Sequence, residues 1–161
     1  MTQTSTTSSH NVFAIEVTPD VANERRVAPY ETVGRITVGE FSEEFRMNLS
    51  YWGVPDYRRQ WICALERLED GPSAVSCLVS SITDPEDSNF IFCWPLYRSG
   101  GTVFVQNAII FLDELREKFD PENPWLSVDP RCTVDEDGNR ISEWSTGIDE
   151  VRFFLDMQRG N

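Results

Sequence analysis

The sequence has few of the residues from which most enzyme and metal sites are built. Among its 161 residues there is one histidine, His10, and one lysine, Lys118. A single histidine in a polar N-terminal segment does not supply the base of a serine-histidine or cysteine-histidine pair, or the ligands of a typical zinc hydrolase. The common phosphate-binding glycine loops are also missing. We therefore predict that the protein is not an enzyme and that it uses no catalytic residues, cofactor or metal.

Long apolar runs are missing as well. No run approaches the roughly 18–20 residues that a membrane-spanning helix needs. The N-terminus lacks the basic start and the apolar segment of a secretory signal. These features predict a cytoplasmic protein without a membrane partner.

The cysteines do not form a recognisable motif. Cys63, Cys77, Cys93 and Cys132 contain no C-x-x-C pair, so neither a zinc ribbon nor a redox motif is supported. Each lies among apolar neighbours, where a free thiol packs as a small apolar side chain. Without an export signal, we expect four reduced thiols that are mostly buried.

Acidic side chains, in contrast, are abundant. The chain has 27 acidic and 14 basic residues, which gives a formal net charge of −13. Direct binding of a nucleic-acid backbone needs a positive surface and is therefore not expected. A negative field attracts a basic protein partner and speeds its encounter, although the same charge also serves solubility.

Alternating and β-branched apolar segments indicate strands. The predicted strands are residues 11–17, 34–38, 44–49, 73–82, 89–98 and 102–110, with a last hairpin around residues 137–139. The run at 89–98 is nearly all apolar, so we expect a central strand buried on both faces. Within it, Pro95 cannot donate a ladder hydrogen bond, so pairing must break or bulge there. Ser99-Gly100-Gly101 predicts a hairpin turn.

Three segments have helical periodicity or helix-start signals. Residues 55–71 carry an apolar face and a proline in the first turn, and Gly71 and Pro72 end the predicted helix. Residues 111–119 predict a short helix, and Thr146 with Asp149 forms an approximate capping box for a helix over 147–158. The fold class is therefore α+β: a single domain with a mainly antiparallel sheet of about six strands and two to three helices packed on it. Residues 1–10 are expected to be a disordered tail, residues 11–161 the domain, and residues 18–32 a loop.

Charged turns and aromatics near element ends are the candidate binding residues. The first acidic turn comprises Asp84, Glu86 and Asp87, and the second acidic turn comprises Asp135, Glu136 and Asp137. We interpret both as partner-facing, with solvated turns as the alternative, since neither matches the ligand frame of a calcium loop. Trp52 and Tyr97 are the candidate aromatic anchors, with core packing as their alternative role.

Four segments together resemble a known family. They are SYWGVPDYRRQW, FCWPLYRSGGTVFVQNAIIFLDEL, FDPENPW and ISEWSTGIDEVRFFL. In this order and spacing the chain resembles the immunity proteins of bacterial contact-dependent growth inhibition systems. The resemblance covers roughly residues 33–156.

The resemblance implies a small α+β protein that binds and neutralises one cognate toxin C-terminal domain. Many such toxins are nucleases with basic clefts, which agrees with the acidic charge of this chain. A toxin-neutralising immunity protein is therefore the predicted function, with a basic toxin domain, expected to be a nuclease, as its partner. A non-catalytic chaperone or adaptor for a secreted effector is the alternative.

Overall fold

The protein is described from a computed structural model, in which residues 12–18 and 30–160 are placed. The tail predicted for residues 1–10 and most of the loop predicted for residues 18–32 lie outside this part of the chain. At the end of that predicted loop, a strand already begins at Glu31.

The described residues form two antiparallel sheets and two α-helices. The first sheet has the order β1 (Phe13–Val17), β2 (Glu31–Val38) and β3 (Phe41–Asn48). The second has the order β4 (Val75–Ser81), β5 (Phe90–Ser99), β6 (Thr102–Gln106) and β8 (Glu143–Gly147), and β7 (Ala108–Phe111) pairs with β5. The helices are α2 (Val54–Arg67) and α3 (Ile148–Arg159). The α+β class is confirmed, but about six strands in one sheet become eight strands in two.

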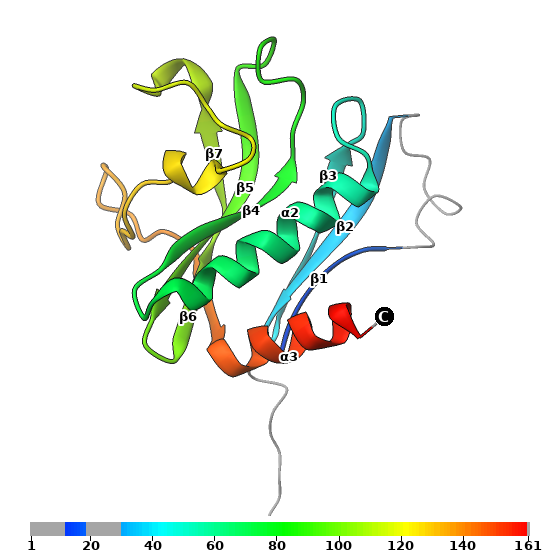
Figure 1. Ribbon diagram of the computed structural model, residues 1–161. Coiled ribbons are helices and arrows are strands. Elements are labelled where there is room, and N and C mark those ends of the chain that lie inside the picture. The colour runs from blue at the N-terminus through cyan, green and yellow to red at the C-terminus, as the bar shows by residue number, and fades with distance from the viewer. Residues whose placement is uncertain (1–11, 19–29, 161) are drawn as a thin grey trace, which may run out of the picture.

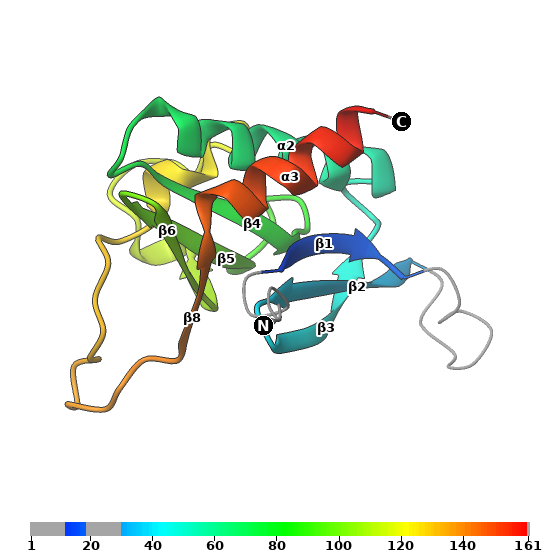
Figure 2. The same cartoon turned by 90° about the horizontal axis from the view of Figure 1, so that it is seen from below.

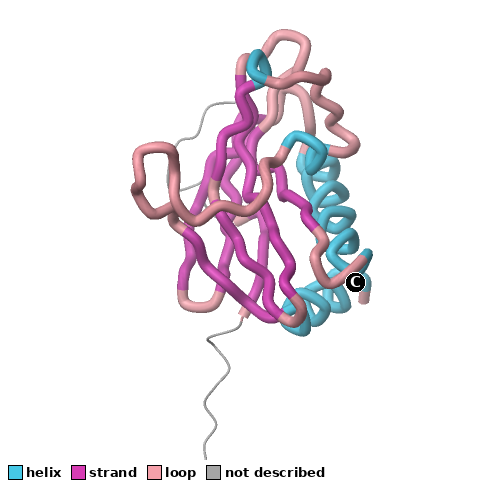
Figure 3. The backbone as a smooth tube through the Cα atoms, turned by 90° about the vertical axis from the view of Figure 1, so that its left-hand side faces the viewer, coloured by secondary structure: helices cyan, strands magenta, loops and turns pink. Residues whose placement is uncertain are grey.

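The two helices lie on the same side of the sheets. In Figure 1, α2 crosses in front of the two sheets and α3 lies below it, and Figure 2 shows both helices above the strands. Figure 3 shows loops at the top of the sheets and on the side away from the helices, while the connection through Trp125 lies on the helix side, where Arg67 of α2 stacks on the Trp125 ring. Side chains from both sheets and both helices join in one apolar core. Between the sheets, the Trp94 ring packs against Phe41, Phe45 and Trp144.

Helix α2 closes the outer edge of β4. The side-chain amide of Gln60 donates to the Cys77 carbonyl at 2.9 Å and accepts from the Val79 N–H at 2.8 Å. Trp61 Nε1 also donates to the Val79 carbonyl at 2.8 Å. An unpaired edge strand is a template for unwanted pairing, and here helix side chains occupy its backbone groups. The edge of the second sheet at β4 is therefore protected.

Pro95 interrupts the other side of β5, as the sequence predicts. Strands β6 and β7 share one register with β5, since Leu96 faces Val105 and Cys93 faces Ala108. Between these pairs Pro95 faces β6 and β7 without an N–H, and the ladder is broken there. The sequence therefore forms two short strands, β6 and β7, beside the one long strand β5.

The helix predicted for residues 111–119 is wrong. Strand β7 continues through Phe111, which pairs with Phe90, and only the single 3-10 turn Leu112–Glu114 follows. A helix of nine residues gains too little to nucleate alone, and pairing with β5 uses the residues of its first turn. A second 3-10 turn, Pro124–Ser127, lies in the connection between β7 and β8.

The capping box predicted at the start of α3 is also wrong. The N-cap is Gly147, and no side-chain hydrogen bond caps the helix. Thr146 is instead a buried residue of β8, where it pairs with Val103. Because the strand continues up to the helix, Thr146 cannot adopt the position of a cap.

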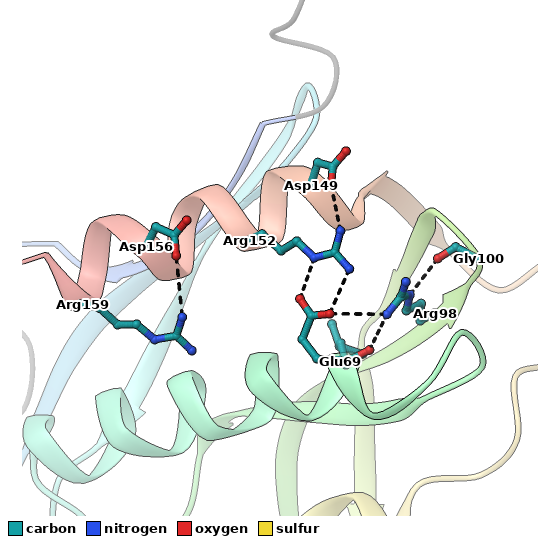
Figure 4. Close-up of polar contacts among 8 residues, drawn as sticks. Glu69, Arg98, Gly100, Asp149, Arg152, Asp156 and Arg159 are labelled. Atoms are coloured by element: carbon teal, nitrogen blue, oxygen red, sulfur yellow. Dashed lines mark hydrogen bonds and ion pairs between the residues drawn. The ribbon is translucent and has the colours of Figure 1, made fainter.

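An ion-pair network joins the end of α2 to α3. Figure 4 shows Arg152 of α3 in a bidentate contact with Glu69, at 2.7 and 2.9 Å. Arg152 also donates to Asp149, and Arg98 of β5 donates to the Leu68 carbonyl on the other side. The guanidinium of Arg152 holds the pKa of the Glu69 carboxyl below its ordinary value. The network fixes α3 at the end of the molecule away from β7 (Figure 1).

Candidate functional site

Four large apolar side chains are exposed on one face of the β5–β7 pair. This apolar strip consists of Phe90, Phe92, Ile109 and Phe111, whose exposed fractions lie between 39% and 46%. Phe90 is directly opposite Phe111, and Phe92 is directly opposite Ile109. The Phe90 and Phe92 rings also pack edge to face at 5.3 Å. Contiguous exposed apolar side chains of this size are typical of interaction surfaces.

The apolar strip is a continuation of the core between the two sheets, at a point that the first sheet does not cover. Residues two apart on a strand share a face, so Phe90 and Phe92 lie on the face of Trp94. Trp94 is 1% exposed because the first sheet covers it, whereas Phe90 and Phe92 extend past that sheet. The central strand predicted to be buried on both faces is therefore open at its N-terminal end.

The outer edge of β7 has no strand beside it in the described structure. The Leu112 N–H donates to the Asn89 carbonyl at 2.9 Å. Because backbone groups alternate in direction along a strand, the N–H and C=O of Ile110 also point toward β5. The backbone groups of Ile109 and Phe111 therefore point away from β5. No group of residues 12–18 or 30–160 makes a hydrogen bond to them. Strand β8 does not reach this far, because it begins only at Glu143, opposite Gln106.

A hollow lies on each face of this edge. The hollow beside the apolar strip, of about 730 Å³, is lined by Phe92, Ile109, Phe111, Trp144 and Glu43 among others. On the opposite face, a hollow of about 510 Å³ lies under the connection from Leu115 to Ile141. Both include residues 107–109 and Phe111 in their walls. The edge of β7 is thus accessible from both faces.

Carboxylates surround this region. Glu43 lines the hollow beside the apolar strip, and Glu114 lines the opposite hollow. Neither makes an ion pair with a basic group in the part of the chain that is described. Glu86 of the first acidic turn, just before β5, is paired with Lys118 at 2.6 Å. Unpaired carboxylates beside exposed apolar groups are suited to a partner that carries both apolar and basic side chains.

The two predicted acidic turns are both on the surface. All six of their carboxylate residues are exposed. In the first acidic turn, Asp84 accepts from the Glu86 N–H, and in the second, Asp135 accepts from the N–H groups of Asp137 and Asn139. The turns lie at separate corners of the molecule (Figure 1). The second acidic turn is on a loop closed by a single bridge between Val134 and Arg140, so the predicted hairpin is rudimentary.

The two predicted aromatic anchors are not exposed. Tyr97 is 6% exposed, and its hydroxyl donates to the Asp129 carbonyl at 2.8 Å. Burial raises the pKa of Tyr97 to about 12, so the hydroxyl remains a donor at neutral pH. Trp52 is half-buried against Tyr57 at 5.3 Å and lines a small hollow of about 100 Å³ near Trp125. Both rings are packed within the fold, and Tyr97 ties the Asp129 segment to the sheet.

The thiols and carboxylates do not assemble a metal site in the described residues. No three of their histidine, cysteine or acidic side chains converge closely enough to hold an ion. All four cysteines are free, as predicted, but only Cys77 and Cys93 are buried, whereas Cys63 and Cys132 are exposed. The adjacent Cys93 thiol, together with burial, raises the pKa of Cys77. Neither described helix is both long and apolar enough to cross a membrane.

Sequence reasoning missed the apolar strip. The alternation Phe-Ile-Phe-Cys-Trp contains no polar residue that would indicate an exposed face. The sequence predicts ten residues for each of the strands 73–82 and 89–98, so it does not indicate the unequal lengths of the structure, ten residues for β5 and seven for β4. The end of β5 that extends past the first sheet is left exposed. An exposed apolar strip at an open strand edge, on an acidic α+β domain, is typical of a protein-binding module.

Comparison with known proteins identifies the family. Residues 47–154 match the family model described as the CdiI N-terminal domain. A relative from Enterobacter cloacae subsp. cloacae, named immunity protein CdiI, is 41% identical over 121 residues, which are 74% of this chain and 81% of the relative. A solved structure described as a CdiA-CT/CdiI toxin and immunity complex from Enterobacter cloacae contains a similar chain. That match has a TM-score of 0.80 and 33% identity, and it covers 93% of this chain and 100% of the other.

The chain belongs to the CdiI family of contact-dependent growth inhibition immunity proteins. This confirms the family that the sequence motifs indicate.

Proposed function

We propose that this protein is a non-catalytic immunity protein that binds and neutralises a cognate toxin C-terminal domain in the cytoplasm. The observation that carries the proposal is the similarity, along almost the entire chain, to a chain in a solved toxin and immunity complex. The α+β fold supplies a rigid scaffold, and its exposed apolar strip supplies a surface for a protein partner.

The partner is, in this proposal, a basic nuclease. A net charge of −13 opposes contact with nucleic acid and favours contact with a protein whose cleft binds phosphates. In this proposal the first and second acidic turns face the partner, since their carboxylates are exposed and can be approached by arginine or lysine. Tyr97 and Trp52 support the binding surface from within the fold, because both are packed side chains.

The test begins with co-purification of the tagged full chain from its native host. A stoichiometric partner is identified by mass spectrometry, and its toxin domain is expressed with and without this protein. The expected result is a one-to-one complex, loss of toxicity in cells that contain both proteins, and an activity titration that ends at equimolar protein. Activity is then measured on RNA and DNA. Binding is measured at two salt concentrations, because ion pairs at the acidic turns weaken with salt.

Different outcomes overturn different parts of the proposal. A toxin that is neutralised but cleaves neither RNA nor DNA removes the nuclease assignment and leaves the immunity function. A captured effector that is fully active after release, and is not inhibited while bound, identifies a chaperone instead. Charge reversal of both acidic turns that leaves affinity and its salt dependence unchanged removes those residues from the interface. An exposed cation, Arg58, replaced by alanine on α2, is the control for a general effect of charge.

A further inference from the structure

We infer that the toxin adds a strand to the outer edge of β7, across the apolar strip. This inference rests on the proposed function and specifies the part of the surface that performs it. The partner is a basic protein that presents an extended segment of about four residues, with apolar side chains on one face and a lysine or arginine beside them.

The backbone geometry favours an added strand. Ile109 and Phe111 together direct two N–H and two C=O groups away from β5, at alternate positions along β7. This spacing is the one that a neighbouring strand needs, and no residue of the described chain occupies it. The outer edge of β4 differs from that of β7, because the side chains of Gln60 and Trp61 hydrogen-bond to its backbone carbonyls. The fold therefore closes one edge of this sheet and leaves β7 open.

The chain itself shows where a strand would continue the sheet. Strand β8 pairs with β6 from Thr102 to Gln106, and its register, continued, would place residues 138–140 beside Ile109 and Phe111. Those residues instead form part of the loop closed by the Val134–Arg140 bridge. The hollows on both faces of β7 mark the resulting space.

The side chains also suit such a segment. A strand beside β7 would place alternate side chains next to Ile109 and Phe111 on the face of the apolar strip. It would cover apolar groups that are now 45% and 46% exposed. Main-chain hydrogen bonds supply affinity in this mode of recognition, and the side chains on alternate positions supply specificity.

The surrounding charge selects a basic partner rather than a second copy of this chain. Glu43 and Glu114 lie on opposite faces of the edge. The first acidic turn precedes Phe90, and the loop of the second acidic turn leaves the sheet beyond Gln106. The edge thus has acidic segments at both ends. Two copies paired here would bring these like charges together, whereas a basic segment would be attracted.

The first experiment measures backbone protection in the complex. Amide hydrogen exchange by NMR is recorded for the free full chain and for its complex with the toxin domain recovered by co-purification. The amides of Ile109 and Phe111 should exchange fast in the free chain and at least tenfold more slowly in the complex. The Ile110 amide, already bonded to β5, should change little. Equal protection of all three amides in the free chain, or no gain at Ile109 and Phe111 on binding, overturns the proposal.

The second experiment separates backbone pairing from side-chain contact. Ile109→Ala removes the side chain and keeps the N–H, whereas Ile109→Pro also removes the outward N–H, which the fold itself does not use. Toxin affinity should fall for Ile109→Ala and fall at least a further tenfold for Ile109→Pro. Phe153→Ala, at a 67% exposed apolar side chain on α3, is the matched control and should bind as the unchanged protein does.

The outcomes distinguish this inference from the proposed function. Full affinity and toxin neutralisation by folded Ile109→Pro would overturn strand addition while the immunity function stands. Equal losses for Ile109→Ala and Ile109→Pro would indicate contact with the strip alone and would also overturn it. Unfolding curves verify that each variant is folded, and the exchange experiment needs no variant. If the full chain captures no toxin in the co-purification, both the proposed function and this inference are overturned.

Discussion

Replacing Gln60 with leucine should strongly destabilise the protein, because one side chain satisfies two backbone groups of β4. Both hydrogen bonds are buried, and Gln60 itself is 8% exposed. Leucine has a similar size and preserves apolar contact, but it leaves the Cys77 carbonyl and the Val79 N–H unpaired. Each buried group left without a partner costs about 1–3 kcal/mol, so the expected loss for the two groups is about 2–6 kcal/mol.

The assay is urea unfolding followed by tryptophan fluorescence. With a typical dependence of about 2 kcal/mol per molar urea, the midpoint of Gln60→Leu should fall by about 1–3 M. Arg58→Ala, an exposed position on the same helix, should change the stability by no more than about 0.5 kcal/mol. The reasoning would be refuted if the two variants unfolded at the same urea concentration.

Gln60→Glu examines the two bonds separately. The carboxylate can still accept from the Val79 N–H, but its second oxygen then faces the Cys77 carbonyl without a proton between them. Burial raises the pKa of such a carboxyl, and its protonated form can donate to the carbonyl. Relative to the unchanged protein, this variant should therefore recover stability as the pH falls from 7 to 5. A deficit that is constant over this range would contradict the assignment.

Two further predictions test the packing and the electrostatics of the sheets. Gly34→Ala would place a methyl group 2.6 Å from the Phe45 ring, so we expect a loss of about 1–3 kcal/mol and a lower melting temperature by calorimetry; an unchanged melting temperature would contradict the close packing. The Arg131 guanidinium holds the pKa of the Glu143 carboxyl below its ordinary value of 4.5. The stability from this pair is present above pH 4.5 and is lost as the pH falls through the lowered pKa. Urea midpoints of the unchanged protein and Glu143→Gln should therefore converge between pH 6 and pH 3, and parallel profiles would count against the pair.

Local sequence signals predicted most elements of the fold. The apolar face of residues 55–71 and the Gly71-Pro72 pair that ends the predicted helix define α2 with its following 3-10 turn, Leu68–Asp70. The alternation of apolar and polar residues defines β2 and β3, although β2 begins earlier than the predicted residue 34. The break in the hydrogen-bond ladder was predictable from Pro95, because a missing N–H has the same consequence in any tertiary context. These features depend on nearest neighbours and backbone chemistry.

The candidate site was only partly predictable. The exposed acidic turns follow from composition, since carboxylates on turns remain in water. The role of Gln60 could not be predicted from composition or pattern, because the neighbouring sequence of a helical glutamine is the same whether its side chain faces solvent or a strand edge. The burial of Tyr97 was not predictable for a related reason: it depends on the Asp129 segment, which is 32 residues away in the chain.

By itself the sequence determined an acidic α+β protein with a well-defined α2, a proline-broken strand and the motifs of an immunity family. The tertiary structure decided that residues 108–111 form a strand rather than lead into a helix, because Phe90 and Phe92 of β5 are available to pair with them. It also decided that, among the described residues, the strip is exposed and the outer edge of β7 has no strand beside it. Both depend on where β3 and β8 end relative to β5, and such relative lengths are set by long-range packing that no local pattern encodes.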